Sequence, residues 1–229
     1  FGEIRSNHFH GGLDFKTGGT IGKPVRALAD GYISRIRVTN GSGYVLDVCY
    51  HNGYSTINRH LSAFLSPIAE RVKKLQYENE NWEVEIIPEP DEYPVKAGQR
   101  IALSGNTGYS FGPHLHLDVF ETETGDYIDP MPFFKKNLKD TRAPKADGIM
   151  LFPQLGKGVV SGSQENKTIL PNSEHPVEAW GVIGTGVKAY DYMDGVNNHY
   201  GVYSVVLTVD GAEVFRSTVA VSYTHLTLP

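Results

Sequence analysis

The sequence predicts a mainly β protein. We expect an antiparallel-sheet domain with one inserted helix, followed by a β-sandwich domain that is truncated. First, the 229 residues include 25 glycines and 13 prolines, a composition that favours turns and strands over helix bundles. Second, Asx-Gly pairs separate the first β-rich runs, as in hairpins. Third, a clear helical period occurs within the first domain at one place only, near residue 70.

The first half of the chain predicts a meander. Residues 1–14 are loop-like, and residues 15–24, rich in Gly and Thr, predict turns. Asp30-Gly31, Asn40-Gly41 and Asn52-Gly53 then separate four predicted strands, which are residues 25–28, 32–39, 44–50 and 54–61. Connections this short make neighbouring strands antiparallel.

A helix is predicted over residues 67–79. Ser66 is a good N-cap, Pro67 suits the first helical position, and Ile68, Val72 and Leu75 share one face. A strand at 82–87 and a polar connection at 88–94 follow. Residues 95–98 and 100–103 lead to a Gly-rich turn, a strand is predicted at 114–121, and residues 127–134 close the domain.

The second half has a different pattern. Residues 135–147 form a charged linker, and residues 148–220 predict a β-sandwich-like domain. Its expected strands are 149–152, 177–182, 186–192, 200–209 and 213–217. Residues 221–229 resemble the translation of a transposon adapter used in sequencing libraries, and we expect them to be a non-native tail that leaves this domain incomplete.

Composition excludes several classes of protein. The net charge of −5 argues against a nucleic-acid binder. A single cysteine, Cys49, excludes an internal disulfide and a multi-cysteine zinc site. No run approaches the roughly 20 apolar residues that span a membrane, so we expect no membrane-spanning segment in this chain. It also contains no signal peptide.

Two histidines near the middle of the chain are candidates for a site. His114 and His116 lie at i and i+2 of an extended segment, so they face the same side of a sheet about 7 Å apart. One can bind a metal while the other faces a substrate. The preceding Gly-rich run, residues 104–113, lacks the Lys-Ser/Thr of a phosphate-binding loop, and we expect it to turn the chain into this strand.

A second motif supplies the other candidate ligands. His10 and Asp14, with Gly11 and Gly12 between them, can present two ligands across a turn. Together with one histidine of the later pair they make two imidazoles and a carboxylate. This set suits zinc and leaves its fourth tetrahedral position open, as in a catalytic site.

The two motifs together resemble a known family. His10-Gly11-Gly12-Leu13-Asp14-Phe15 and, over residues 104–116, Ser-Gly-Asn-Thr-Gly followed by Gly-Pro-His-Leu-His resemble the M23 zinc metallopeptidases. These are LytM/lysostaphin-type endopeptidases that cut peptidoglycan peptides. The resemblance covers roughly residues 1–134.

The resemblance implies a set of roles for individual residues. It implies one Zn²⁺ per chain, bound by His10, Asp14 and His116, and it makes His60 and His114 the catalytic histidines. One histidine would take a proton from the attacking water and pass it to the leaving amine, and the other would hydrogen-bond the developing oxyanion. The sequence leaves open which does which.

The resemblance also implies a substrate and a location. The partner is a peptidoglycan cross-link or stem peptide, and the protein is exported to the periplasm, the cell envelope or the exterior. The insert at residues 63–94 is long for the family and is either a structural elaboration or a lid that selects the peptide.

Alternatives remain at this stage. A catalytically silent LytM-type regulator or cell-wall-binding protein could keep the same fold. An Fe(II) oxygenase with two histidines and a carboxylate would use H-x-D, which His10 and Asp14 do not match. Asp118 is either a partner of the metal site or a polar face residue. The aromatic residues of the second domain form either a carbohydrate-binding face or a core; they are Trp180, Tyr190, Tyr192 and Tyr200.

Overall fold

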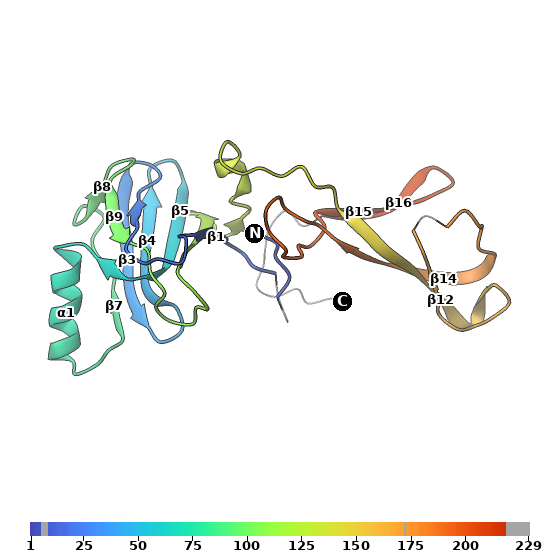
Figure 1. The fold of residues 1–229 in the computed structure, drawn as a ribbon, viewed down its shortest axis with the longest axis horizontal. Helices are drawn as coiled ribbons and strands as arrows, with labels where there is room; N and C mark the ends of the chain where they lie inside the picture. The colour runs from blue at the N-terminus through green and yellow to red at the C-terminus, as the bar shows by residue number, and fades with distance from the viewer. Residues whose placement is uncertain (6–8, 172, 219–229) are drawn as a thin grey trace. The chain divides into compact units, whose positions relative to one another are not determined.

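The computed structural model describes residues 1–5, 9–171 and 173–218 (Figure 1). It contains two compact units, the first formed chiefly by His10–Phe134. The second begins at Lys135 and includes residues 2–5 and 9. The expected non-native tail, residues 221–229, lies outside the described residues. Within the described residues no helix has the length and apolar character needed to cross a membrane.

The first unit is built on a large antiparallel sheet with the order β1-β10-β5-β4-β3-β7. These strands are β1 (Leu13–Lys16), β10 (His114–Glu121), β5 (Tyr54–Leu61), β4 (Gly43–Tyr50), β3 (Gly31–Thr39) and β7 (Val84–Ile86). Two short strands, β8 (Pro94–Val95) and β11 (Tyr127–Ile128), pair with β3 and β10. Three of the four strands of the predicted meander are present as β3, β4 and β5, whereas the strand predicted at 25–28 is β2, which pairs with β9 in another sheet. The mainly β, antiparallel fold class is confirmed.

A smaller layer covers the core of this sheet. It contains a second sheet, β2 (Pro24–Arg26), β9 (Arg100–Leu103) and β6 (Ala63–Phe64), and the helix α1 (Ile68–Glu78). The helix was predicted at 67–79, and its apolar residues Ile68 and Val72 are buried as the helical period requires. They join a core in which Leu46 and Leu61 are fully buried. The unit ends in a 3₁₀ helix, η1 (Met131–Phe134).

The prediction that residues 13–16 form loop and turns was wrong. They form β1, which pairs along its whole length with β10. The strand has only four residues and lies between Gly11-Gly12 and Thr17-Gly18-Gly19, so its alternation is too short to recognise from sequence.

The second unit consists of a three-stranded and a two-stranded antiparallel sheet. The first sheet contains β13 (Lys167–Ile169), β12 (Lys145–Val160) and β14 (Ala179–Tyr190), and the second contains β15 (Ser204–Val209) and β16 (Ala212–Thr218). The β-rich character is as expected, whereas packing of these sheets into a sandwich stays a prediction.

Two predicted strands, 177–182 and 186–192, are one strand, β14. Residues 183–185, which the prediction left between the two strands, continue the ladder: Gly184 pairs with Phe152, and Gly186 pairs with Met150. The space that a β-carbon at Gly186 would occupy is 3.1 Å from the Phe152 ring. These glycines therefore accommodate an aromatic ring rather than a turn.

Truncation of a core side chain should lower the stability of the first unit. Leu46 is fully buried between the two layers of the first unit. We expect Leu46→Ala to lower the free energy of unfolding of this unit by about 2–5 kcal/mol through lost burial and a residual cavity. The measurement is urea unfolding followed by Trp82 fluorescence in a Trp180→Phe background. Ile87→Ala, at a side chain that is 74% exposed, is the control; an equal loss in both variants would contradict this assignment of the core.

Candidate metal and catalytic site

The register of β1 against β10 brings two sequence-distant motifs together. Asp14 lies directly opposite His116, and Leu13 lies opposite Leu117. Both leucines are buried, so the register that fills the core also places Asp14 and His116 on the other face of the sheet. His10 comes from the segment just before β1.

Three atoms converge at this place. His10 Nε2 and His116 Nδ1 are 3.0 Å apart. Asp14 Oδ1 lies 3.0 Å from His116 Nδ1 and 3.4 Å from His10 Nε2. Ligands at 2.0–2.2 Å from a tetrahedral zinc are separated by about 3.3–3.6 Å. Two of the separations are about 0.3 Å shorter than this range and the third lies within it, so the three residues form a candidate metal site that needs only a small adjustment to hold a tetrahedral ion.

A buried carboxylate supports the His116 ring from behind. His116 Nε2 donates to Asp118 Oδ1 at 2.9 Å, and Asp118 Oδ2 lies 2.9 Å from Arg59 Nη2. Because Nε2 is engaged as the donor, the neutral ring presents the lone pair of Nδ1 to the metal position. Asp118, for which the sequence left two readings, is a partner of a candidate ligand.

The electrostatics of the site keep Asp14 ionised. Burial by itself raises the pKa of the Asp14 carboxyl, but hydrogen bonds from His10 and His116 and their charges hold it well below its usual range. An ionised carboxylate is the form that binds a metal.

A β-bulge directs His60 into the same place. Asn58 pairs with Leu46 and Leu61 with Tyr44, so Arg59 and His60 together lie opposite the single residue between them on β4. His60 has a left-handed φ of 64°. Regular alternation would turn it to the face of Asn58, yet its ring lies 4.8 Å from the His114 ring and 6.0 Å from the His116 ring. Bulges commonly redirect side chains at functional sites in this way.

His60 and His114 are held in the same tautomer. His60 Nδ1 lies 2.9 Å from the carbonyl oxygen of Thr107, and His114 Nδ1 lies 2.8 Å from that of Gly112. A carbonyl oxygen only accepts, so both Nδ1 atoms carry hydrogen and both Nε2 atoms have a lone pair. His114 Nε2 is 3.6 Å from Asp14 Oδ1. Burial lowers the pKa of the His60 imidazole, against the opposing effect of the Thr107 carbonyl, and so favours its neutral form.

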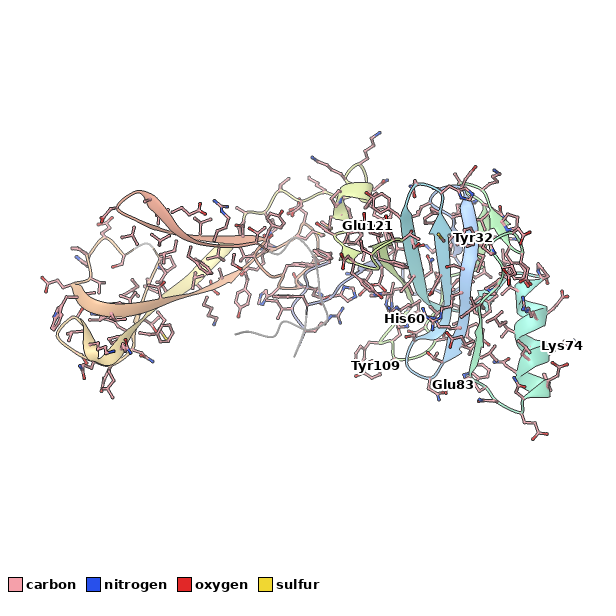
Figure 2. The ribbon with its side chains drawn as sticks, turned by 180° about the vertical axis from the view of Figure 1, so that it is seen from behind. Tyr32, His60, Lys74, Glu83, Tyr109 and Glu121 are labelled. Atoms are coloured by element: carbon pink, nitrogen blue, oxygen red, sulfur yellow. The ribbon has the colours of Figure 1, made fainter. Side chains whose placement is uncertain are left out.

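Figure 2 shows His60 and Tyr109 toward the same end of the large sheet, with Tyr32 toward the other. Tyr109 belongs to the Gly-rich run, which reaches this end because Tyr109 N–H donates to the carbonyl of Gly41 at 2.7 Å. The run therefore turns the chain into β10, as expected, and it also supplies the carbonyl groups that orient both histidines.

Sequence reasoning missed two supporting residues, Arg59 and Thr107, because nothing in the sequence indicates their partners. At Gly12, a β-carbon would lie 2.7 Å from Asp118 Oδ1 and 2.8 Å from His116 Nε2. The site therefore requires glycine at this position for close approach, a need that the Gly-Gly pair after His10 could have indicated.

The aromatic residues of the second unit do not form one stacking face. Tyr190 and Tyr192 pack against His199, with ring centroids 4.8 and 5.5 Å away, while the Trp180 side chain is 70% exposed. A carbohydrate-binding role for this unit gains no support from this arrangement.

Known proteins are similar to about half of this chain. No protein-family model matches the chain. The glycyl-glycine endopeptidase ALE-1 of Staphylococcus capitis is 35% identical over 135 residues, which are 56% of this chain and 29% of that protein. The peptidoglycan DD-endopeptidase ShyB of Vibrio cholerae is 36% identical over 110 residues, 48% of this chain and 20% of that protein. The crystallised catalytic domain of lysostaphin from Staphylococcus simulans is 32% identical, with 56% of this chain and 80% of that chain covered and a TM-score of 0.38.

Over about half of its length the chain is thus similar in sequence to named glycyl-glycine and peptidoglycan endopeptidases. The chain spans less than a third of the length of the two curated relatives. Another relative, from Buchnera aphidicola, is named a metalloprotease, in keeping with the candidate metal site formed by His10, Asp14 and His116.

The close contact at Gly12 yields a prediction. We expect Gly12→Ala to lower metal affinity roughly 10–100-fold, because the added methyl group displaces Asp118 and His116 from their hydrogen bond. Metal titration of the chelator-stripped protein against a competing chromophoric chelator measures this loss. Gly41→Ala is the matched control, since a β-carbon there meets nothing within 4 Å; equal affinities of the two variants would contradict a steric requirement at residue 12.

The ion pair between Asp118 and Arg59 yields a second prediction about metal affinity. Asp118→Asn keeps an oxygen that accepts from His116 but removes the charge, and we expect roughly 10–100-fold weaker metal binding. Glu123→Gln, in the exposed turn after β10, should bind metal as the wild type does. If Asp118→Asn keeps wild-type affinity in the same titration, Asp118 serves only to pair with Arg59.

Proposed function

We propose that this chain is a zinc-dependent endopeptidase that hydrolyses peptide bonds in peptidoglycan cross-links or stem peptides. The observation that carries the proposal is the convergence of three ligand atoms beside two histidines that present free Nε2 atoms. The named activities of ALE-1 and ShyB, which are peptidoglycan or glycyl-glycine endopeptidases, agree with it.

The proposal assigns one Zn²⁺ per chain to His10 Nε2, Asp14 Oδ1 and His116 Nδ1. Two nitrogens and one carboxylate oxygen are a donor set that zinc favours in catalytic sites. When bound, zinc supplies a Lewis acid that polarises the scissile carbonyl and lowers the pKa of a coordinated water toward ~7.

In this proposal His60 and His114 transfer the protons of the reaction. Each has Nδ1–H bound to a backbone carbonyl, so each offers Nε2 as the acceptor for a proton from the attacking water. A histidine that has accepted it carries Nε2–H and can donate to the leaving amine or to the developing oxyanion. The backbone carbonyls hold both rings in place while protonation changes.

Peptidoglycan as the substrate implies action outside the cytoplasm, in the periplasm, the cell envelope or the exterior. The catalytically silent alternative is less well supported, because all five side chains that the family uses are present and gathered at one place.

Paired histidine variants test the proposal. We expect His116→Ala to lose both zinc and activity, because it removes a ligand. His114→Ala should retain zinc and lose roughly 10²–10⁴-fold in turnover, the usual contribution of a proton-transfer group. Zinc content is measured by elemental analysis, and activity by mass analysis of products from glycine-bridged and directly cross-linked peptidoglycans.

Addition of a chelator should abolish the wild-type digestion, and added zinc should restore it. His51→Ala, at an exposed hairpin end, is the control and should keep both zinc and activity. A His116→Ala protein that still holds stoichiometric zinc would overturn the ligand assignment, and a wild-type protein that cuts neither peptidoglycan would overturn the proposed function.

A further inference from the structure

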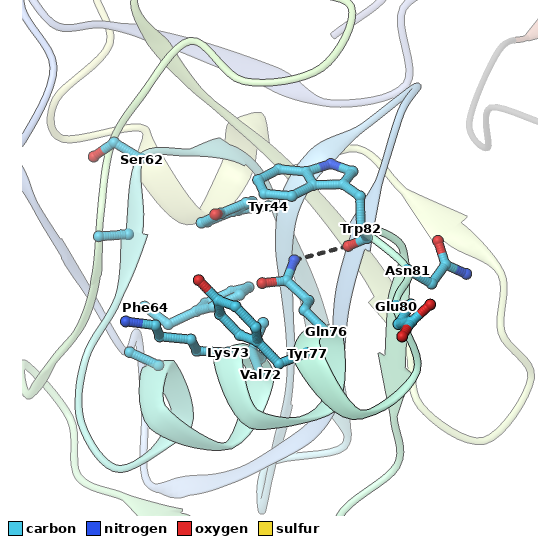
Figure 3. A pocket seen from close by; sticks show the side chains of 12 residues that line it. Tyr44, Ser62, Phe64, Val72, Lys73, Gln76, Tyr77, Glu80, Asn81 and Trp82 are labelled. Carbon is cyan, nitrogen blue, oxygen red and sulfur yellow. Dashed lines mark hydrogen bonds between the residues drawn. The ribbon is translucent and has the colours of Figure 1, made fainter.

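A pocket lies beside the helix of the insertion, between α1 and β6, with a volume of about 630 Å³ (Figure 3). The lining side chains come mainly from residues 63–82, together with Tyr44 and Ser62. None of them belongs to the metal and histidine site. The inserted residues therefore form a pocket of their own, in addition to extending the fold.

Aromatic rings dominate the walls. The Trp82 side chain is 53% exposed and that of Tyr77 is 74% exposed. Figure 3 shows their rings on either side of the Gln76 side chain. Behind the opening, the Tyr44 ring lies 5.7 Å from that of Trp82 and stacks on Phe64 at 5.1 Å. Large exposed rings backed by a packed aromatic layer form a rigid, flat surface for a ligand.

Polar groups surround these rings. Gln76 Nε2 donates to the carbonyl of Trp82 at 2.7 Å, which fixes the Trp82 backbone and leaves the Gln76 amide oxygen as an acceptor. Asn81 Oδ1 accepts from the N–H of Glu83 at 3.0 Å, which leaves its NH₂ group as a donor. Lys73 and Glu80 also line the pocket, and their opposite charges cancel.

We propose that this pocket binds a sugar ring and, given the proposed function on which this assignment rests, an amino sugar of the peptidoglycan glycan strand. A pyranose has an apolar C–H face that stacks on aromatic rings and equatorial hydroxyl groups that need amide and carboxylate partners at the edge. The balanced charge does not favour a phosphate or nucleic acid, and the polar rim does not favour a lipid. The strand beside it, β6, has two residues and offers little edge for an extended peptide.

The pocket is joined to the catalytic histidines through one residue. Thr107 Oγ1 accepts from the N–H of Tyr44 at 2.9 Å, and the Thr107 carbonyl accepts from His60 Nδ1–H at 2.9 Å. Ser62, in the pocket wall, lies two residues after His60. The pocket lies on the α1 side of the large sheet, whereas Asp14 and His116 lie on its other face, so Thr107 links the two places at the end of the sheet.

Calorimetric titration of the chelator-stripped full chain tests the proposal. The probes are a β-1,4-linked tetramer of N-acetylglucosamine, the corresponding glucose tetramer and a free stem peptide. We expect saturable binding of the amino-sugar tetramer, and roughly tenfold weaker binding by Tyr77→Ala and Trp82→Ala, since truncation of a central aromatic anchor commonly costs this much. Lys74→Ala, on the outer side of α1, is the matched control. In a Trp180→Phe background the fluorescence of Trp82 should change with the same affinity.

Each result bears on the proposal. Absence of saturable binding, or unchanged affinity in both aromatic variants, overturns the pocket as a sugar site. Binding of the stem peptide in place of the sugars also overturns it, and equal binding of the glucose tetramer supports a saccharide site while overturning its assignment to amino sugars. The His116→Ala variant should bind the tetramer as the wild type does, so a failure of the endopeptidase proposal remains distinguishable from a failure of this one.

Discussion

The pairing of β1 with β10 is the interaction on which the site depends. It sets Asp14 opposite His116 because Leu13 and Leu117 must both enter the core. A slip of one residue would turn Asp14 to the core face and separate it from His10 and His116. The geometry of the candidate metal site is therefore set by core packing.

Around Asp14 and His116, a close approach of the chain at Gly12, the Arg59 side chain and a β-bulge in β5 complete the site. Gly12 lets the chain pass against the His116–Asp118 hydrogen bond, and Arg59 neutralises the buried Asp118 charge. Arg59 reaches Asp118 through the regular register of β5 against β10, whereas the bulge against β4 turns the next residue, His60, toward His114.

The insertion extends the same end of the sheet. Thr107 bonds to Tyr44, which underlies the aromatic pocket, and to His60, which belongs to the catalytic cluster. If the pocket holds a sugar ring, the first unit would contact the glycan on the α1 side of the sheet and the peptide at the histidines. Substrate choice could then depend on the insertion without any change in the metal ligands.

The sequence by itself determined the mainly β class and the order of the central strands, and it supplied the candidate residues of the site, because turn pairs and two spaced motifs are local signals. It could not determine three features, because each depends on a distant residue. Strand β1 depends on Leu117, the bulge at Arg59-His60 lies opposite Val45, and the continuity of β14 depends on Phe152. It left Asp118 undecided, because a polar residue alternating along a strand gains a role only from what faces it. Only the tertiary structure decided which side chains meet, as convergence arises from register and core packing rather than from spacing along the chain.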